Sequence, residues 1–444
     1  MTTQPRAITS FVAERSAVAV PTDERPESEP IRVGLFNVKY SPNLGDGILC
    51  ECLEAEMRRS APNSVFESFD LAGRTAYSDG GRFRAAALTL LHYSPISIRH
   101  ALAGTVLRYS MKRNVMRSWR GALAKYDAVV VGGGNLFADT DLNFPLKIAA
   151  AMAEVRGAGL PAAVFGVGVS NNWSSRGEAL FRRALAGDCL VYASVRDPRS
   201  AEIWNRCLGQ AGVVSAAVVH DPGVLVSDHV AKRRSNDDGR PLVGLGLTHP
   251  MTLRYHADEP GANHWSLTAW YHQLLDACLE RGWRVAVFTN GSPEDDTYLR
   301  QAALAFAEHT RDGSLTIAPR FRRPAELASF ISGLDLLMAH RLHANITAYS
   351  YGVPQIAFSW DAKLKGFLSK VDRSDCICTA GVDPVTKAMS IATRELREGV
   401  EPIRRLKVLA QARADVAELV ETLRRAVAAA RQAKCDLARR RAAS

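Results

Sequence analysis

Three widespread catalytic signatures are missing from this sequence of 444 residues. It has no G-x-x-x-x-G-K-[ST] phosphate-binding loop, no H-E-x-x-H helix and no G-x-S-x-G elbow. P-loop nucleotide hydrolysis, zinc proteolysis and α/β-hydrolase chemistry are therefore disfavoured. No apolar run approaches the roughly 18 residues of a membrane-spanning helix, and the N-terminus lacks the apolar core of a signal peptide. We expect a cytoplasmic protein, with peripheral contact at the inner face of a membrane as a further option.

Cysteine is too sparse for a disulfide framework, because only eight are spread over the whole chain. Cys50 and Cys52, like Cys376 and Cys378, have C-x-C spacing, and no histidine pair at zinc-finger spacing accompanies them. Buried or incidental thiols are favoured over a metal site, and we expect no metal.

Acidic residues are absent between Gly81 and Tyr126, although the chain carries 46 acidic and 56 basic residues in total. Nine basic residues lie in this stretch among apolar ones at roughly helical spacing: Arg82, Arg84, Arg99, Arg108, Lys112, Arg113, Arg117, Arg120 and Lys125. Two interpretations stay open, a basic amphipathic helix pair packed on its own domain or a docking element for an anionic membrane. The net charge of +10 favours anionic partners, but no nucleic-acid-binding motif accompanies it.

Short apolar runs alternate with segments of helical periodicity from Ile31 onward. This alternation predicts parallel strands joined by right-handed crossovers. A polar, charged stretch interrupts the alternation, which restarts at Leu242. We expect an α/β protein with two doubly wound, Rossmann-like domains that face each other across a cleft. Its expected parts are a disordered leader (1–30), an N-terminal α/β domain (31–225) with a basic insertion (about 74–125), a linker (226–241), a C-terminal α/β domain (242–394) and a helical segment with a basic tail (395–444).

Glycine-rich turns follow several predicted strands. The segment 43–47 (NLGDG) lies between the first strand and its helix, where Gly45 permits close backbone approach and helix N–H groups favour an anion. Asp46 is either the cap of that helix or a partner of sugar hydroxyls. The segment 129–137 (VVVGGGNLF) places three glycines and Asn135 at the carboxyl end of a buried strand, and 165–172 (FGVGVSNN) repeats the theme with Gly168. Either turn is a ligand loop or simply a tight structural turn.

Basic residues follow three further predicted strands. Arg196, in SVRDP at 194–198, is positioned either to bind a phosphate or carboxylate or to pair with Asp197 at the surface. Arg341 and His343 lie where a strand ends near Met338 and a helix begins, a location that favours an anionic ligand. The next strand is followed by three polar residues that can face the same cleft: Asp361, Lys363 and Lys365.

The order of these motifs resembles the polysaccharide pyruvyl transferase family over about residues 33–367. The matching motifs are Asn43-x-Gly45-Asp46, Gly132-Gly133-Gly134, Gly166-x-Gly168, Val195-Arg196, Asp221-Pro222, Arg341-x-His343, Gly352-x-Pro354 and Asp361-x-Lys363. The resemblance implies a fold like that of two-domain, type B glycosyltransferases. It also implies transfer of pyruvate from phosphoenolpyruvate, as a co-substrate and without a further cofactor, onto a saccharide or lipid-linked saccharide. The product would be a ketal on a surface-polysaccharide or cell-wall precursor.

The same resemblance implies roles for individual residues. His343 would protonate the methylene carbon of phosphoenolpyruvate, and Arg341, Arg196 and either Lys363 or Lys365 would hold its carboxylate and phosphate. Asp46 and the glycine loops of the first domain would face the acceptor sugar. Two other functions remain open, a nucleotide-sugar glycosyltransferase of the same architecture and a non-catalytic carbohydrate- or lipid-phosphate-binding protein. The oligomeric state is open as well.

Overall fold

A computed structural model of the chain describes residues 29–77, 116–209, 212–233, 239–256, 267–305, 313–359, 362–379 and 383–442. The leader up to residue 28, most of the basic insertion, and Asp361 lie outside these residues. Within them, the strands form two six-stranded sheets in which every neighbouring pair is parallel. The expected α/β class with two doubly wound units is confirmed.

The first sheet has the strand order β2-β1-β3-β4-β5-β6. Its strands are β1 (Arg32–Asn37), β2 (Val65–Asp70), β3 (Ala128–Gly132), β4 (Ala162–Val167), β5 (Leu190–Val195) and β6 (Ala217–Val218). The chain runs outward from β1 to β2 and then crosses back to β3, so the strand order reverses between β1 and β3. Ligands of open α/β sheets bind at the carboxyl ends of the strands at such a reversal.

Helices cover both faces of the first sheet to form the first lobe. The apolar side chains of β3 lie alternately on the two faces, and all five of its residues are buried, as expected for a central parallel strand. One face packs on α1 (Leu44–Ser60) and on α16 (Pro402–Ala442). The other packs on α4 (Met116–Leu123), α5 (Asn143–Gly157), α6 (Ser175–Leu185) and α7 (Pro198–Leu208).

The second sheet has the order β12-β11-β10-β7-β8-β9. Its strands are β7 (Leu242–Gly246), β8 (Arg284–Phe288), β9 (Leu315–Ile317), β10 (Leu336–Ala339), β11 (Gln355–Phe358) and β12 (Ile377–Cys378). Because β7 is the first of these strands in the chain, the order reverses between β7 and β10. The loops after β7 and β10 therefore border the second crevice.

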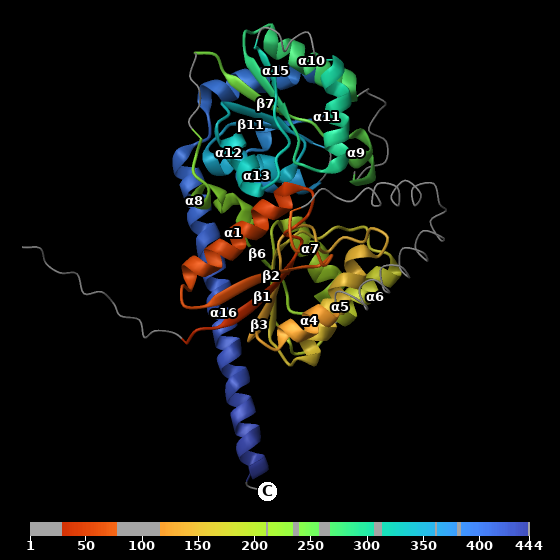
Figure 1. Cartoon of the computed structure of the whole chain (residues 1–444), viewed down its shortest axis with the longest axis vertical. Coiled ribbons are helices and arrows are strands. Elements are labelled where there is room, and N and C mark those ends of the chain that lie inside the picture. Colours follow the sequence, from red (N-terminus) through yellow and green to blue (C-terminus); the bar gives the residue numbers. More distant parts are fainter. Residues whose placement is uncertain are drawn as a thin grey trace, which may run out of the picture.

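Helices on both faces of this sheet complete the second lobe. They are α9 (Pro250–His256), α10 (Leu267–Leu279), α11 (Pro293–Ala305), α12 (Pro324–Ser332), α13 (Leu342–Tyr351), α14 (Ala362–Lys370) and α15 (Pro384–Glu398). Helices α10, α11 and α15 pack on one face, while α12 and α13 pack on the face nearer the first lobe. Figure 1 shows the two lobes stacked, with α12 and α13 next to α1.

Two helices join the lobes. Helix α1 packs Leu53 and Met57 on the first sheet, while its Ile48 and Cys52 belong to the apolar cluster of the second lobe. Helix α16 runs beside both lobes and then projects beyond the first (Figure 1). Its early residues pack with α13, and its middle residues cover the first sheet.

Several elements differ from their predicted bounds. The sequence predicts a helix from Asp46 to Arg59, but α1 begins two residues earlier, at Leu44. Asn43 caps it: the Asn43 Oδ1 accepts a hydrogen bond from Gly45 N at 3.3 Å. The expected helix from about Glu395 is two helices, α15 and α16, and Gly399 between them has a φ of 70°, which ends the first. The first part of the expected linker forms the short helix α8 (Val226–His229), which directly follows a 3-10 turn (Pro222–Leu225) at the end of the first domain.

Candidate functional site

The predicted motifs meet where the two lobes touch. The loop after β1 contacts the loop after β8, since Leu44 N donates to Asn290 O at 2.9 Å. Helix α13 begins at this seam, with Arg341 as its N-cap residue and His343 in its first turn. The side chains of Arg341 and His343 point to different partners, so they form two separate clusters.

Gly45 permits the close approach of α1 to His343. A Cβ atom on Gly45 would lie 2.6 Å from the Cβ of His343 and 3.0 Å from its Nδ1, distances at which atoms clash. This contact explains why a glycine stands in the first turn of α1. Gly45 therefore has a packing role: it makes room for the side chain of His343, the predicted catalytic histidine.

The His343 imidazole lies between two carboxylates of the first lobe. Its Nδ1 is 3.6 Å from Asp46 Oδ1, and its Nε2 is 3.7 Å from Asp221 Oδ2. The side chain of Asp46 is 23% exposed, whereas that of Asp221 is 4% exposed. Asn43 caps α1, so Asp46 is not the cap of this helix. Its carboxylate instead pairs with His343 of the other lobe.

Asp221 also binds Arg196. The Arg196 guanidinium donates from Nη1 to Asp221 Oδ2 at 3.2 Å, and both side chains are buried. Burial alone raises the pKa of Asp221, but the His343 imidazole, the Arg196 cation and the Gly223 N–H together lower that pKa below its usual value. Asp221 is therefore a buried anion that joins two candidate functional residues, and Arg196 is not paired with Asp197 at the surface.

A narrow crevice between the lobes adjoins this carboxylate. Three basic side chains line it, Arg196 from the first lobe and Lys363 and Lys370 from α14. Its free volume is about 10 Å³, room for about one water molecule. Lys365 is exposed on α14 and does not line the crevice. The structure thus separates the two lysines that the sequence could not distinguish.

Lys370 is a functional candidate that the sequence analysis did not identify. Its Nζ donates to the main-chain oxygens of Val219 and Arg196, which links α14 to the first sheet. Burial lowers the pKa of Lys370 to about 8, and the nearby carboxylates of Asp415, Asp197 and Asp221 only partly oppose this effect. No local pattern marks this lysine, because its surroundings come from distant parts of the chain.

The glycines after β3 serve mainly the packing of α1. Gly133 has a φ of 79°, and a Cβ on it would lie 2.0 Å from a methyl group of Leu49. A Cβ on Gly132 would lie 3.1 Å from Leu53, whereas one on Gly134, with a φ of 77°, would be 3.6 Å from Val38. At Gly132 and Gly133 the structure supports the tight structural turn.

Asn135 and Gly168 lie closer to the charged residues. A Cβ on Gly168 would lie 2.6 Å from Asn135 Oδ1 and 2.7 Å from Arg196 Nη2. The Asn135 Nδ2 donates to Ser170 Oγ at 3.0 Å, while its Oδ1 is buried without a hydrogen-bond partner. The glycine therefore leaves space for the amide and the guanidinium to lie side by side.

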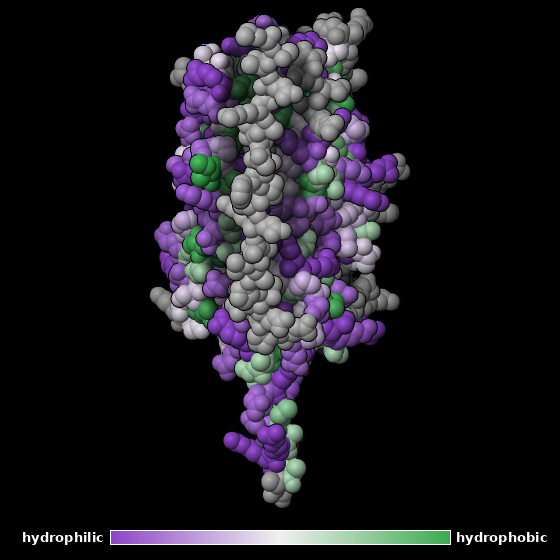
Figure 2. Space-filling view, turned by 90° about the vertical axis from the view of Figure 1, so that its left-hand side faces the viewer, coloured by the Kyte–Doolittle hydropathy of each residue, from purple (hydrophilic) through white to green (hydrophobic). Residues whose placement is uncertain are grey.

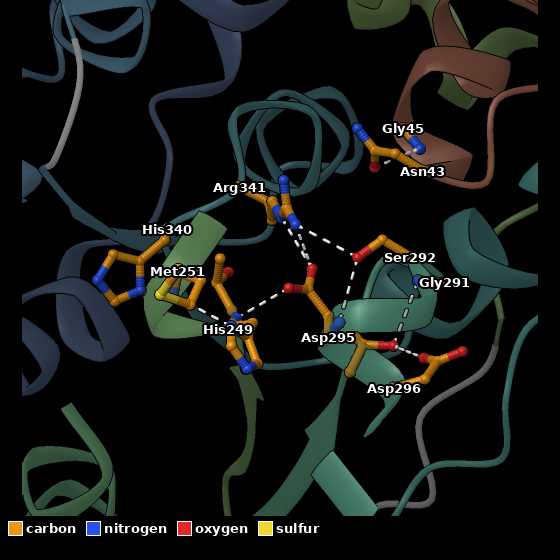
Figure 3. A network of polar contacts seen from close by, with 12 residues as sticks. Asn43, Gly45, His249, Met251, Gly291, Ser292, Asp295, Asp296, His340 and Arg341 are labelled. Carbon is orange, nitrogen blue, oxygen red and sulfur yellow. Dashed lines mark hydrogen bonds and ion pairs between the residues drawn. The ribbon is translucent and has the colours of Figure 1, made fainter. Parts of the chain in front are cut away.

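Arg341 binds a buried carboxylate of its own lobe. Its Nε donates to Asp295 Oδ2 at 3.1 Å, its Nη2 also contacts Asp295, and Ser292 Oγ lies 3.5 Å away. Asp295 accepts a further hydrogen bond from His249 N, so this network joins the loops after β7, β8 and β10 (Figure 3). The charge of Arg341 is thereby balanced within the second lobe.

His340 stays neutral beside this network. Burial, followed by the neighbouring Arg341 cation, lowers the pKa of His340 to about 3. Its Nδ1 lies 2.9 Å from the Tyr271 hydroxyl in an aromatic cluster. His340 is thus buried among aromatic side chains, whereas His343 is the histidine that lies beside the carboxylates of the first lobe.

Among the described residues, one group has the spacing of a metal site: Asp375, Cys376 and Glu395. Arg373 binds Glu395, and Arg394 binds both Asp375 and Glu395. These carboxylates already have cationic partners, so the group forms an ion-pair network.

The predicted site residues thus fall into three sets. Asn43, Gly45, Asp46 and His343 meet at the start of α1, and Gly168, Asn135 and Arg196 lie together near Asp221. Lys363 faces the adjoining crevice. Arg341, Lys365 and the glycines at 132–134 point elsewhere, and Asp361 lies outside the described residues. Asp221 was part of a recognised motif without an assigned role, although its position after a strand and before a proline was a signal.

Comparisons with known proteins bear on the family and the fold of the chain. A family model described as polysaccharide pyruvyl transferase matches residues 43–362. No curated protein matches the chain at a significant level. None of the described helices is long and apolar enough to cross a membrane.

Solved structures with folds similar to this chain include the following three. A putative UDP-N-acetylglucosamine 2-epimerase from Listeria monocytogenes shares 10% identity at a TM-score of 0.50, covering 88% of this chain and 94% of that one. The S. aureus MnaA–UDP co-structure shares 10% at 0.51, covering 87% and 94%. TcCGT1 in complex with UDP shares 9% at 0.51, covering 90% and 100%. Identities this low establish the fold alone, and the expected glycosyltransferase-B-like architecture is confirmed.

Proposed function

This chain belongs to the polysaccharide pyruvyl transferase family, and on that premise we propose that it transfers a pyruvyl group from phosphoenolpyruvate to a saccharide. The acceptor is a sugar of a surface-polysaccharide or cell-wall precursor, free or lipid-linked. Two of its hydroxyls become bridged by the pyruvate as a ketal, and phosphate is released. Phosphoenolpyruvate is consumed as a co-substrate, without a further cofactor.

The observation that carries this proposal is the crevice between the lobes. Arg196, Lys363 and Lys370 line it, and Asp221 connects it to His343. Phosphoenolpyruvate carries a carboxylate and a phosphate, so several cations are required to hold it. A histidine beside such a cationic pocket is placed to protonate the methylene carbon.

The other residues have distinct proposed roles. Asp46, partly exposed at the N-terminus of α1, faces the acceptor and takes the proton of a sugar hydroxyl. Arg341 binds Asp295 and holds the start of α13, on which His343 is carried. It is therefore proposed as a positioning residue, in contrast to the direct contact with phosphate that its motif implied.

Donor chemistry is tested by phosphate release from phosphoenolpyruvate in the presence of lipid-linked saccharides from a bacterial envelope extract. We expect release to depend on the acceptor and to fall at least a hundredfold in Arg196→Ala and His343→Ala. Arg397→Ala, at an exposed position of α15, is the control and retains activity. Transfer from a UDP-sugar together with indifference to phosphoenolpyruvate would contradict the proposal.

We also propose peripheral contact with an anionic membrane. The chain has a net charge of +10, and the last turn of α16 carries Arg439, Arg440 and Arg441. Figure 2 shows this end of the helix projecting from the body with hydrophilic residues along it. Co-sedimentation with phosphatidylglycerol vesicles, absent with phosphatidylcholine and lost when the three arginines become Gln, is the expected result. Equal binding to both vesicle types would count against electrostatic docking.

A further inference from the structure

Both ring nitrogens of His343 face carboxylates that differ in environment. Asp46, opposite Nδ1, belongs to α1 and is partly open to solvent, whereas Asp221, opposite Nε2, is buried after β6. Arg196 at the end of β5 shares Asp221, and Lys363 and Lys370 of α14 line the neighbouring crevice. Arg341 is turned away toward Asp295. The charged groups around the imidazole thus come from α1, from the loops after β5 and β6, and from α14.

The Nε2 atom of His343 is buried and has no hydrogen-bond partner within the described part of the chain. At 3.7 Å, Asp221 is close enough to stabilise a positive imidazole by charge but too far for a normal hydrogen bond. Asp221 itself remains ionised, because Arg196 and the Gly223 N–H also bind it. A proton on Nε2 is thus stabilised electrostatically without being committed to an acceptor.

We propose that Asp221 is a positioning residue that holds His343 as an imidazolium with Nε2 as the proton-donating atom. This inference rests on the proposed function for its catalytic meaning. Asp221 does not touch the reacting atoms. It acts through His343, while Asp46 on the opposite side of the ring serves as the base.

The proton count of the first step is balanced. The C–C π electrons of the enol phosphate form a C–H bond with the Nε2 proton, and a sugar oxygen forms a bond to the adjacent carbon. The hydroxyl proton passes to Asp46, so one proton is donated and one is accepted. A second hydroxyl then bonds to the same carbon as the bond to phosphate breaks. The proton of this second hydroxyl passes to the leaving oxygen of the phosphate. The ionised Asp46 and imidazolium are restored by exchange with solvent.

The arrangement forms only when the lobes are closed. His343 belongs to the second lobe, and both carboxylates belong to the first, so separation of the lobes removes both partners at once. The imidazolium is therefore stabilised while the lobes are in contact, which couples readiness of the acid to the approach of the two lobes.

Ring ¹⁵N NMR of the full-length protein tests the inference without turnover. The His343 signals are assigned by their loss in His343→Gln. We expect both ring nitrogens to be protonated at pH 7 in the wild type, and the ring to become largely neutral in Asp221→Asn. Asp70→Asn, another buried carboxylate of the first lobe, is the matched control and leaves the His343 signals unchanged. A neutral His343 in the wild type, or identical signals in Asp221→Asn, would overturn the inference.

Kinetics give the second readout. In Asp221→Asn, kcat should fall at least tenfold with a smaller change in KM for phosphoenolpyruvate, and the alkaline limb of the pH–rate profile should move to lower pH. A uniform loss at all pH values with a lowered melting temperature would show a structural role only and refute the proposal. If NMR gives the expected result but the wild type does not consume phosphoenolpyruvate with any acceptor, the proposed function fails while the charge pairing stands.

Discussion

Single residues at the seam between the lobes have more effect than their size suggests. Gly45 has no side chain, yet its Cα lies so close to His343 that any added carbon must displace the imidazole. The position of the His343 ring therefore depends on the lack of a Cβ atom at position 45 as well as on the charged groups around it. In packing this close, a small change in side-chain volume directly shifts the neighbouring atoms.

Gly45→Ala should consequently lower phosphoenolpyruvate-dependent turnover by at least tenfold, because its Cβ would lie 2.6 Å from that of His343. Initial-rate assays and a thermal melt are the measurements. Gly121→Ala is the control, since Gly121 lies in α4 with nothing within 4 Å of an added Cβ. It should keep full activity and be more stable by up to about 1 kcal/mol, through helix propensity. Unchanged activity in Gly45→Ala would show that the contact is not critical.

Helix α14 distributes its lysines by helical geometry. Lys363 and Lys370 face the crevice, seven positions apart on one side of the helix, and Lys365 faces solvent. The element thus delivers two cations to the site from a single helix face. Burial lowers the pKa of Lys370 to about 8, which makes its charge sensitive to pH.

The affinity for phosphoenolpyruvate should weaken above pH 8, where Lys370 loses its proton. The dissociation constant should rise by a factor that approaches tenfold per pH unit. The sign follows from linkage: an anion favours the charged lysine, and the pKa of about 8 makes that form scarce at higher pH. Titration calorimetry between pH 7 and 9.5 measures this effect. Lys370→Arg should remove the pH dependence, because arginine stays charged. Lys365→Arg should behave like the wild type, and a pH dependence that survives in Lys370→Arg would exclude Lys370 as its source.

Helix α16 stabilises the first lobe through its middle third. Leu423 is fully buried against the first sheet, whereas Leu437, on the projecting part, is 52% exposed. Leu423→Ala should lower the free energy of unfolding by about 2–5 kcal/mol, and Leu437→Ala by less than about 0.5 kcal/mol. Urea denaturation followed by circular dichroism compares them. Equal effects would mean that the projecting end is packed in solution.

At the scale of the whole molecule, the described closed crevice is too small for the donor. Its free volume holds about one water molecule, and the lobes are joined across it by Lys370 and by the contact of Gly366 with Asp197. If phosphoenolpyruvate is the donor, as proposed, it must bind when the lobes are further apart than described. Hinge motion of this kind is common in two-domain enzymes.

A disulfide between Asp197→Cys and Gly366→Cys should trap the closed state. A Cβ on Gly366 would lie 3.3 Å from the Cβ of Asp197, near the range that a disulfide requires. We expect the oxidised double variant to lose turnover and a reductant to restore it. Asp197 is the N-cap residue of α7, so the two single variants are assayed under both conditions to account for the loss of this cap and for the native thiols. Full activity of a double variant shown by mass spectrometry to be oxidised would mean that no opening is needed.

Local patterns in the sequence determined the type of fold and the positions of most motifs. The alternation predicted strands from Ile31 and Leu242 and a helix after Met338, and β1, β7 and α13 begin at Arg32, Leu242 and Leu342. These predictions succeeded because periodicity and turn chemistry are properties of neighbouring residues. The Arg341-x-His343 motif and the family resemblance likewise required only the order of residues. The family match over residues 43–362 confirms that resemblance.

Only the tertiary structure decided which charges meet. Asp221 and Asp46 reach His343 from the other lobe, Lys370 gains its low pKa from burial between lobes, and Arg341 is paired with Asp295. These residues are far apart in the chain, and neither their distances nor their burial follow from local sequence. Electrostatic interactions depend on both quantities, so the chemistry of the site is a property of the folded, closed molecule.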